Sequence, residues 1–167
     1  PDILDGKGMS SAHRHAALSA IKGYVAGLPP APLVVIKDPH IVPLAELWFE
    51  AAQETGFSVA AVLTVRHPNE VIGSLQAVTG VAPELASALW LKASLLAERA
   101  TRNVARVFVD YANLLEDWRR ELKRVSVELG IELDWSDDRA IDEFLTPGLR
   151  HHQCDSVSNR FGAEWIS

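Results

Sequence analysis

A cation and a hydroxyl group follow one apolar stretch of the sequence at a spacing that suits anion binding. The stretch VLTVRHPNEVIGSL (62–75) begins with β-branched residues, continues with Arg66 and Pro68, and reaches Ser74 eight residues after the arginine. A guanidinium grips a phosphate through two parallel hydrogen bonds, and a helix that starts at Pro68 would add free backbone N–H groups. The pattern predicts an anion site. In the alternative interpretation, Arg66 pairs with Glu70 or caps the helix, and Ser74 only packs.

A second group of reactive side chains follows the short apolar run LVVIK (33–37). Lys37 ends this run, and Asp38, Pro39 and His40 come directly after it. A lysine ammonium neutralises phosphate or sulfonate charge, while a carboxylate or an imidazole can accept a proton. The pattern predicts Lys37 as an electrostatic group and Asp38 or His40 as a general base. Alternatively, Asp38 caps the turn that follows and Lys37 is solvated.

Tyr111 and the segment LRHHQC (149–154) are two further candidates. Tyr111 ends the apolar run ARVFVDY (105–111), where its ring can stack on a nucleotide base while its hydroxyl stays hydrated. Alternatively it is a half-buried edge residue. The segment with Arg150 is predicted to be a loop that contacts an anion. Alternatively, it is a solvated tail. The adjacent histidines lack the i,i+4 spacing of a helical metal site, and Cys154 adds little, so we expect no bound metal.

Apolar runs alternate with helical patterns along the chain, which indicates an α/β fold. We expect strands at 33–37, 58–65 and 105–111, and helices at 11–27, 43–56, 68–78, 82–103, 113–130 and 137–145. The strands are apolar throughout, as in parallel sheets that are covered on both faces. Ligands bind such sheets at the carboxyl ends of the strands. The candidates that follow the three strands are therefore expected to converge on one edge: Lys37, Asp38, His40, Arg66 and Tyr111.

The composition restricts the classes of function. The 167 residues are expected to form a single domain, 1–167, with 48% hydrophobic and 23% charged residues. The net charge of −6 argues against a nucleic-acid surface or an anionic-membrane surface, so an anion site has to be a local pocket. The single cysteine excludes an intrachain disulfide and favours a cytoplasmic protein. No apolar run approaches the roughly 20 residues that span a bilayer.

Together these motifs resemble the bacterial branch of the sulfotransferases that use PAPS (3′-phosphoadenosine 5′-phosphosulfate). VLTVRHPNEVIGSL resembles the family's 3′-phosphate motif, and VFVDYANLLEDWRRELKRVSVELGI resembles its strand ending in Tyr-Glu-Asp-Leu with the helix after it. VVIKDPHI resembles the Lys-Asp-Pro-Arg segment, and FLTPGLRHH resembles the C-terminal segment of that branch. The resemblance covers about residues 30–153. Ala112 and Asn113 replace the acidic pair, and His40 replaces the arginine.

The resemblance implies a three-layer α/β/α fold with a parallel sheet, of the P-loop NTPase type. It implies transfer of a sulfuryl group from PAPS to a hydroxyl or amine of a small-molecule or carbohydrate acceptor, which leaves PAP. Arg66 and Ser74 would then hold the 3′-phosphate, Tyr111 would line the adenine pocket, and Arg150 would contact the cofactor.

The same resemblance suggests roles for the segment after 33–37. Lys37 would offset charge on the leaving phosphate, and His40 or Asp38 would remove the proton of the acceptor. Catalysis of such a transfer is expected to come mainly from positioning and charge stabilisation.

One element of the family is missing from the expected pattern. The family begins with a strand and a loop that cradles the 5′-phosphosulfate, whereas no strand–loop–helix pattern precedes residue 33. The segment DGKGMSS (5–11) has suitable residue types but no apolar strand before it.

Because this element is missing, two other hypotheses about the function stay open. One is a P-loop nucleotide or small-molecule kinase, which needs a Walker-type loop and Mg²⁺. The other is a catalytically silent binding domain with the same fold.

Overall fold

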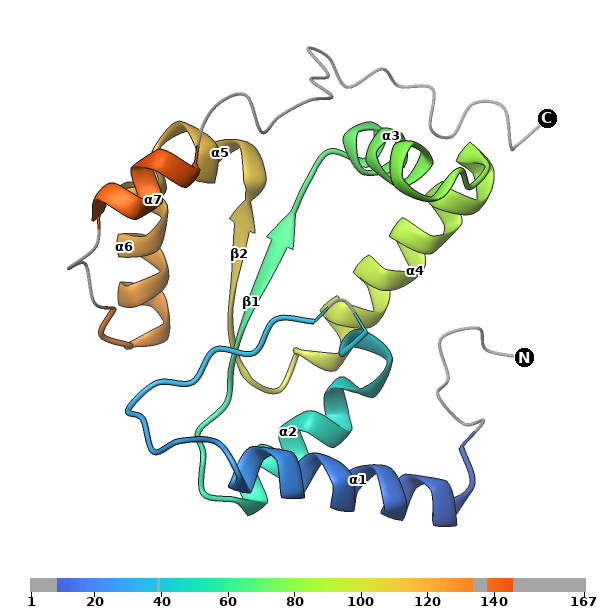
Figure 1. Cartoon of the computed structure of the whole chain (residues 1–167), viewed down its shortest axis with the longest axis vertical. Helices are drawn as coiled ribbons and strands as arrows, with labels where there is room; N and C mark the ends of the chain where they lie inside the picture. Colours follow the sequence, from blue (N-terminus) through green and yellow to red (C-terminus); the bar gives the residue numbers. More distant parts are fainter. Residues whose placement is uncertain (1–8, 39, 134–137, 146–167) are drawn as a thin grey trace.

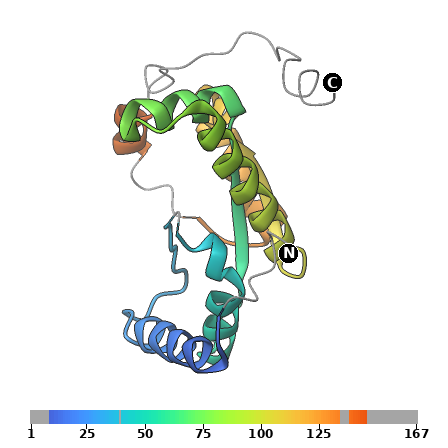
Figure 2. The same cartoon turned by 90° about the vertical axis from the view of Figure 1, so that its right-hand side faces the viewer.

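A short parallel sheet of two strands lies between two groups of helices (Figures 1 and 2). The computed structural model describes residues 9–38, 40–133 and 138–145. Its elements, in chain order, are α1 (Ser11–Ala26), the 3₁₀ turn η1 (Val42–Leu44), α2 (Ala45–Glu54), β1 (Ala60–Val65), α3 (Pro68–Thr79), α4 (Pro83–Ala100), β2 (Ala105–Asp110), α5 (Tyr111–Glu116), α6 (Trp118–Leu129) and α7 (Asp138–Phe144). The mixed α/β class predicted from the sequence is confirmed.

The two strands are parallel, and α3 and α4 make the connection between them. The register runs from Ala60 opposite Ala105 to Val65 opposite Asp110. In Figure 1, α3 and α4 lie to one side of the strands, and α5, α6 and α7 lie to the other. The carboxyl ends of both strands point to the upper end of the view, where α3 and α5 begin. This edge of the sheet therefore brings together the residues that follow β1 and β2.

Local side chains start the two helices at this edge. The ring of His67 accepts a hydrogen bond from the backbone N–H of Asn69 at 3.3 Å, and Pro68 occupies the first position of α3. The carboxylate of Asp110 accepts from the backbone N–H of Ala112 at 2.7 Å and so begins α5. The first backbone N–H groups of a helix have no partner within the helix. Proline is favoured there because it has no N–H, and an N-cap side chain is favoured because it accepts a hydrogen bond from one of these groups. The chain therefore changes from strand to helix within two residues at each site.

Within the described residues, two small hydrophobic cores join neighbouring elements. One joins α1 to α2, and the other joins β2 to α6 through Val107, Val109 and Val125. The sheet is only partly covered in the described residues: Val62 of β1 remains 51% exposed, and Phe108 of β2 remains 44% exposed. By the register, Val62 shares a face with Val107 and Phe108 lies on the opposite face. The expectation of a sheet covered on both faces is therefore wrong for this part of the chain.

The strand predicted at 33–37 is also wrong. Residues 33–38 have no regular secondary structure, and Val35 is 80% exposed. A short apolar strand is stabilised only when a neighbour pairs with it and its faces are covered. Pro29, Pro30 and Pro32, which precede the run, cannot donate ladder hydrogen bonds. The run therefore stays an open connection that leads towards η1 and α2.

The helix predicted at 113–130 is divided in two. The backbone at Asp117, with φ −152° and ψ 83°, ends α5, and its carboxylate accepts from the backbone N–H of Arg120 to start α6. Tyr111 begins α5 instead of ending the strand. The other predicted helices are confirmed, with shifts of a few residues at their ends. Within the described residues, no helix has the length and apolar character needed to cross a membrane.

Candidate anion-binding site

Arg66 and Tyr111 meet at the carboxyl edge of the sheet. Val65 ends β1 opposite Asp110, so the residues that follow the two strands are neighbours. The guanidinium carbon of Arg66 lies 4.7 Å from the centroid of the Tyr111 ring. This distance is within the range of a cation–π contact. The parallel register thus places a cation on an aromatic ring where ligands of α/β sheets usually bind.

Glu70 holds the same guanidinium from a second direction. The Nε–H of Arg66 donates to Oε2 of Glu70 at 2.9 Å, across one turn at the start of α3. The side chain of Glu70 is 1% exposed, and that of Arg66 is 23% exposed. The alternative interpretation of Arg66, that it pairs with Glu70, is therefore confirmed as a contact. Among the described residues, the terminal Nη nitrogens of Arg66 have no hydrogen-bond partner.

Ser74 lies on the same side of α3 as Glu70, one turn further along the helix. It is half-buried, and its hydroxyl makes no hydrogen bond within the part of the chain that the structure describes. The spacing of Arg66 and Ser74 therefore gives one face of α3 a guanidinium, a carboxylate and a free hydroxyl in succession. Such a face can hold an oxyanion through its N–H and O–H donors.

The start of α3, by contrast, does not supply the free backbone donors expected from the sequence. Pro68 has no N–H, and the N–H of Asn69 donates to the ring of His67. The N–H of Glu70 donates to the carbonyl of His67 at 3.0 Å. An anion at this site would therefore be bound by side chains, and Arg66 would be the main donor.

Asp38 and His40 form a turn of their own. Oδ1 of Asp38 accepts from the backbone N–H of His40 at 2.8 Å and lies 2.8 Å from Nδ1 of the same histidine. These hydrogen bonds hold the pKa of Asp38 below its ordinary value of 3.8. Asp38 is therefore ionised at neutral pH and is a weak proton acceptor. The alternative interpretation, in which Asp38 caps the turn, is confirmed, and the side chain of His40 is 92% exposed.

The structure does not bring this turn to the edge that carries Arg66 and Tyr111. In Figures 1 and 2 the segment before η1 crosses the lower half of the molecule, whereas α3 and α5 begin at its upper half. η1 packs against α4, on whose last turns Leu96 and Ala100 line a pocket with Val42. Because residues 33–37 do not join the sheet, Lys37, Asp38 and His40 do not follow a third strand.

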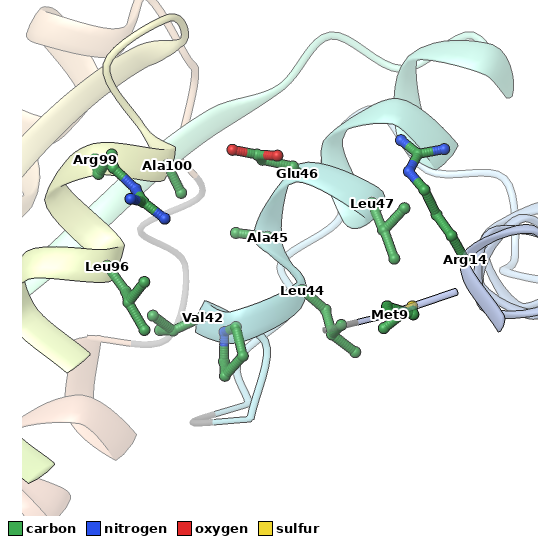
Figure 3. Close-up of a pocket in the computed structure, with 11 residues that line it drawn as sticks. Met9, Arg14, Val42, Leu44, Ala45, Glu46, Leu47, Leu96, Arg99 and Ala100 are labelled. Carbon is green, nitrogen blue, oxygen red and sulfur yellow. The ribbon is translucent and has the colours of Figure 1, made fainter. Parts of the chain in front are cut away.

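A separate pocket of about 170 Å³ lies between α1, η1, α2 and α4 (Figure 3). Figure 3 shows the apolar side chains of Leu44 and Leu96 along it, with Glu46 and Arg99 extending towards one another between α2 and α4. Arg14, at the α1 side, makes an ion pair with Glu50. None of the predicted site residues that the structure describes lines this pocket, so it is distinct from the Arg66 edge.

Several predicted features lie outside the described residues. These are Arg150 with the rest of segment 149–154, and most of DGKGMSS (5–11). Within the described ranges, no three histidine, cysteine, aspartate or glutamate residues are grouped as metal ligands.

Comparisons with protein-family models, with curated proteins and with solved structures found no match to this chain. What the chain does is therefore inferred from its own residues.

Sequence reasoning weighed Glu70 only as a competitor for Arg66 and did not identify Asp110 as the residue that begins α5. The i,i+4 spacing of Arg66 and Glu70 was the signal that could have identified Glu70 as a partner of the arginine. An aspartate directly before a helical pattern was the signal for Asp110, since aspartate is a favoured N-cap.

Proposed function

We propose that the chain binds the nucleotide PAP or PAPS at the carboxyl edge of β1 and β2, and that it transfers the sulfuryl group of PAPS to a hydroxyl or amine acceptor. The observation that supports this most directly is the contact between Arg66 and Tyr111. A 3′-phosphoadenosine carries both a phosphate and an aromatic base, so it suits a guanidinium placed next to an aromatic ring. The motif resemblance of VLTVRHPNEVIGSL supports the same ligand.

In this proposal the 3′-phosphate is gripped by the terminal nitrogens of Arg66 and by the hydroxyl of Ser74, while Tyr111 contacts the adenine. The β1–α3–α4–β2 unit, in which helices connect two parallel strands, is the kind of connection from which the proposed three-layer α/β/α fold of the P-loop type is built. A small-molecule or carbohydrate acceptor and a cytoplasmic location belong to the same proposal.

The proposed transfer consists of three bond changes, and residues of the chain assist two of them. The bond between sulfur and the phosphate oxygen breaks, the acceptor oxygen or nitrogen bonds to sulfur, and the acceptor proton passes to a base. Lys37 is the proposed cation for the leaving phosphate, and His40 is the proposed base. Asp38, whose pKa is lowered, positions His40 through the turn that they share.

One observation favours a second candidate, a nucleotide-binding domain that carries out no transfer. The segment with Lys37 and His40 lies at the opposite end of the strands from Arg66 and Tyr111. Binding of the 3′-phosphate needs only the residues at the Arg66 edge, whereas transfer also needs that segment next to the sulfuryl group. The two candidates therefore agree on the ligand and differ on the chemistry.

Thermal unfolding with and without PAP tests the binding that both candidates share. A ligand at about 100 times its Kd stabilises the folded state by about 2.7 kcal/mol, which raises Tm by several degrees. Adenosine 5′-monophosphate, which lacks the 3′-phosphate, is the matched control and is expected to shift Tm much less. Equal shifts with both nucleotides, or no shift at saturating PAP, would contradict the proposal.

Radiolabelled PAPS separates the two candidates. Transfer of labelled sulfate to any member of a panel of phenols, alcohols, amines and sugars supports the transferase. Tight PAP binding with no transfer and no PAPS hydrolysis supports the binding domain.

A further inference from the structure

Glu70 is a buried carboxylate at the very place where an anion is proposed to bind. Its side chain is 1% exposed, and it accepts the Nε–H of Arg66. Burying an ionised carboxylate is costly, and a buried ion pair often adds little net stability to a fold. A negative charge here also repels a phosphate. Stability and charge therefore do not account for Glu70, and its geometry has to be considered.

The geometry of the pair selects one edge of the guanidinium. An arginine can hold a phosphate side-on, through Nε and one Nη, or end-on, through both Nη nitrogens. Glu70 occupies Nε at 2.9 Å, and the Tyr111 ring lies against the guanidinium, with its centroid 4.7 Å from the guanidinium carbon. The end-on edge is the one that these two contacts leave to a ligand.

We propose that Glu70 is a positioning residue that fixes the guanidinium of Arg66 on Tyr111, so that an incoming phosphate is held end-on by the two terminal nitrogens. This role rests on the proposed binding of PAP. Glu70 acts through Arg66 and does not contact the ligand. Its benefit is a donor pair that is already oriented before the ligand arrives, which reduces the entropy lost on binding.

Substitutions at Glu70 distinguish positioning from charge by the sign of their effect. If charge dominated, Glu70→Ala and Glu70→Gln would both bind PAP more tightly, because each removes a negative charge beside the phosphate. Positioning predicts that Glu70→Ala binds PAP about tenfold more weakly, because Arg66 loses its holder. Glu70→Gln keeps an oxygen acceptor for Nε and is expected to bind as tightly as the wild type or more tightly.

A double-mutant cycle with Arg66 then tests whether Glu70 acts through the arginine. PAP affinity is measured by calorimetry for Glu70→Ala, Arg66→Ala and the variant with both changes. We expect Glu70→Ala to have no further effect once Arg66 is absent. Independent effects of the two changes, or an unchanged affinity for Glu70→Ala, would overturn the proposal.

An NMR measurement on the ligand-free protein gives a readout that does not depend on PAP. The Nε–H of Arg66 is expected to exchange slowly with water in the wild type and in Glu70→Gln, and quickly in Glu70→Ala. Arg139 and Glu143 form a matched control, since they have the same i,i+4 contact at 2.9 Å but are 90% and 67% exposed. Glu143→Gln is expected to leave both the Arg66 signal and PAP affinity unchanged.

The two failures are distinguishable. If the wild type binds no PAP but the Nε–H of Arg66 is protected by Glu70, the proposed ligand is wrong and the positioning of the guanidinium stands. If PAP binds but the Nε–H of Arg66 exchanges as quickly as that of Arg139, the positioning role is wrong and the proposed function stands.

Discussion

Arg66 is the residue on which the candidate site depends, and two contacts of different kinds hold it. A hydrogen bond with Glu70 fixes the direction of the guanidinium, and the ring of Tyr111 makes a cation–π contact with it. Neither contact uses the terminal nitrogens. Among the described residues, these donors have no hydrogen-bond partner while the rest of the side chain is restrained, as expected of a preorganised site.

Replacing Tyr111 tests whether its aromatic ring contributes to PAP binding. Tyr111→Leu is expected to weaken PAP binding by about 0.5–2 kcal/mol, because the cation–π contact with Arg66 is lost. Tyr111→Phe keeps the ring and is expected to bind nearly as the wild type does. The ring of Phe108 contacts Arg106 at 5.3 Å on the same strand, so Phe108→Leu is the matched control. Calorimetric titration with PAP measures all three, and equal affinities for Leu and Phe at position 111 would contradict this role of the ring.

Replacing His40 tests the proposed base. His40→Ala is expected to reduce the rate of sulfuryl transfer from PAPS and to leave PAP affinity close to that of the wild type, since His40 lies away from Arg66. Steady-state rates with labelled PAPS and calorimetry with PAP measure the two quantities. Full transfer activity in the variant would remove His40 from the mechanism.

The sequence predicted these residues unequally well. Arg66 and Tyr111 follow strands that do pair, so their proximity could be predicted from two apolar runs and the rule for parallel sheets. Lys37, Asp38 and His40 were grouped with them only through a third strand, and a run of five apolar residues does not reveal whether a neighbour will pair with it. Pairing depends on the rest of the sheet, which periodicity does not encode.

At the scale of elements, α7 is attached to α6 by a small polar cluster instead of an apolar core. Arg119 contacts Asp138 at 3.2 Å and Asp142 at 2.7 Å, and it lies 4.4 Å from the ring of Trp118. The indole N–H of Trp118 donates to Asp142 at 2.8 Å. The helix itself was predicted from the sequence, whereas its attachment to α6 was not, because contacts between polar side chains far apart in sequence leave no periodic signal.

The docking of α7 is expected to depend on pH through Asp142. Hydrogen bonds from Arg119 and from Trp118 hold the pKa of Asp142 below its ordinary value of 3.8. A carboxyl group with a lowered pKa stabilises the folded state above its unfolded pKa, and this contribution is lost as the pH falls through the folded value. Below about pH 3.8 we therefore expect the amides of α7 to lose protection in hydrogen exchange.

Two substitutions test whether the pH dependence of α7 comes from Asp142. Asp142→Asn can still accept the indole N–H but carries no charge, so it is expected to loosen α7 at neutral pH and to weaken the pH dependence. Glu143→Gln, one residue further on, removes the charge only from the exposed pair with Arg139 and serves as the control. Unchanged exchange of α7 in Asp142→Asn would contradict the role of this carboxylate.

At the scale of the whole molecule, an acidic chain is proposed to bind a highly charged anion. The net charge is −6, and the buried Glu70 offsets the charge of Arg66. Long-range attraction therefore contributes little, and recognition depends on short hydrogen bonds and stacking that salt screens only weakly. We expect PAP affinity to change by less than about threefold between about 20 and 200 mM sodium chloride, as measured by calorimetry. A fall of about tenfold or more would indicate binding to a diffuse basic surface.

The connection between the two strands has a consequence for the order of folding. Ala60 pairs with Ala105 across the whole of α3 and α4, so no tight turn can bring the strands together. Closing such a long segment costs chain entropy before any ladder bond forms, whereas the contacts between α3 and α4 are local and form early. The helical pair is thus expected to assemble first and shorten the distance between the strands. Arg66 and Tyr111, which directly follow the two strands, would meet only in the last step, so a ligand that needs both of them can bind only to a chain that has finished folding.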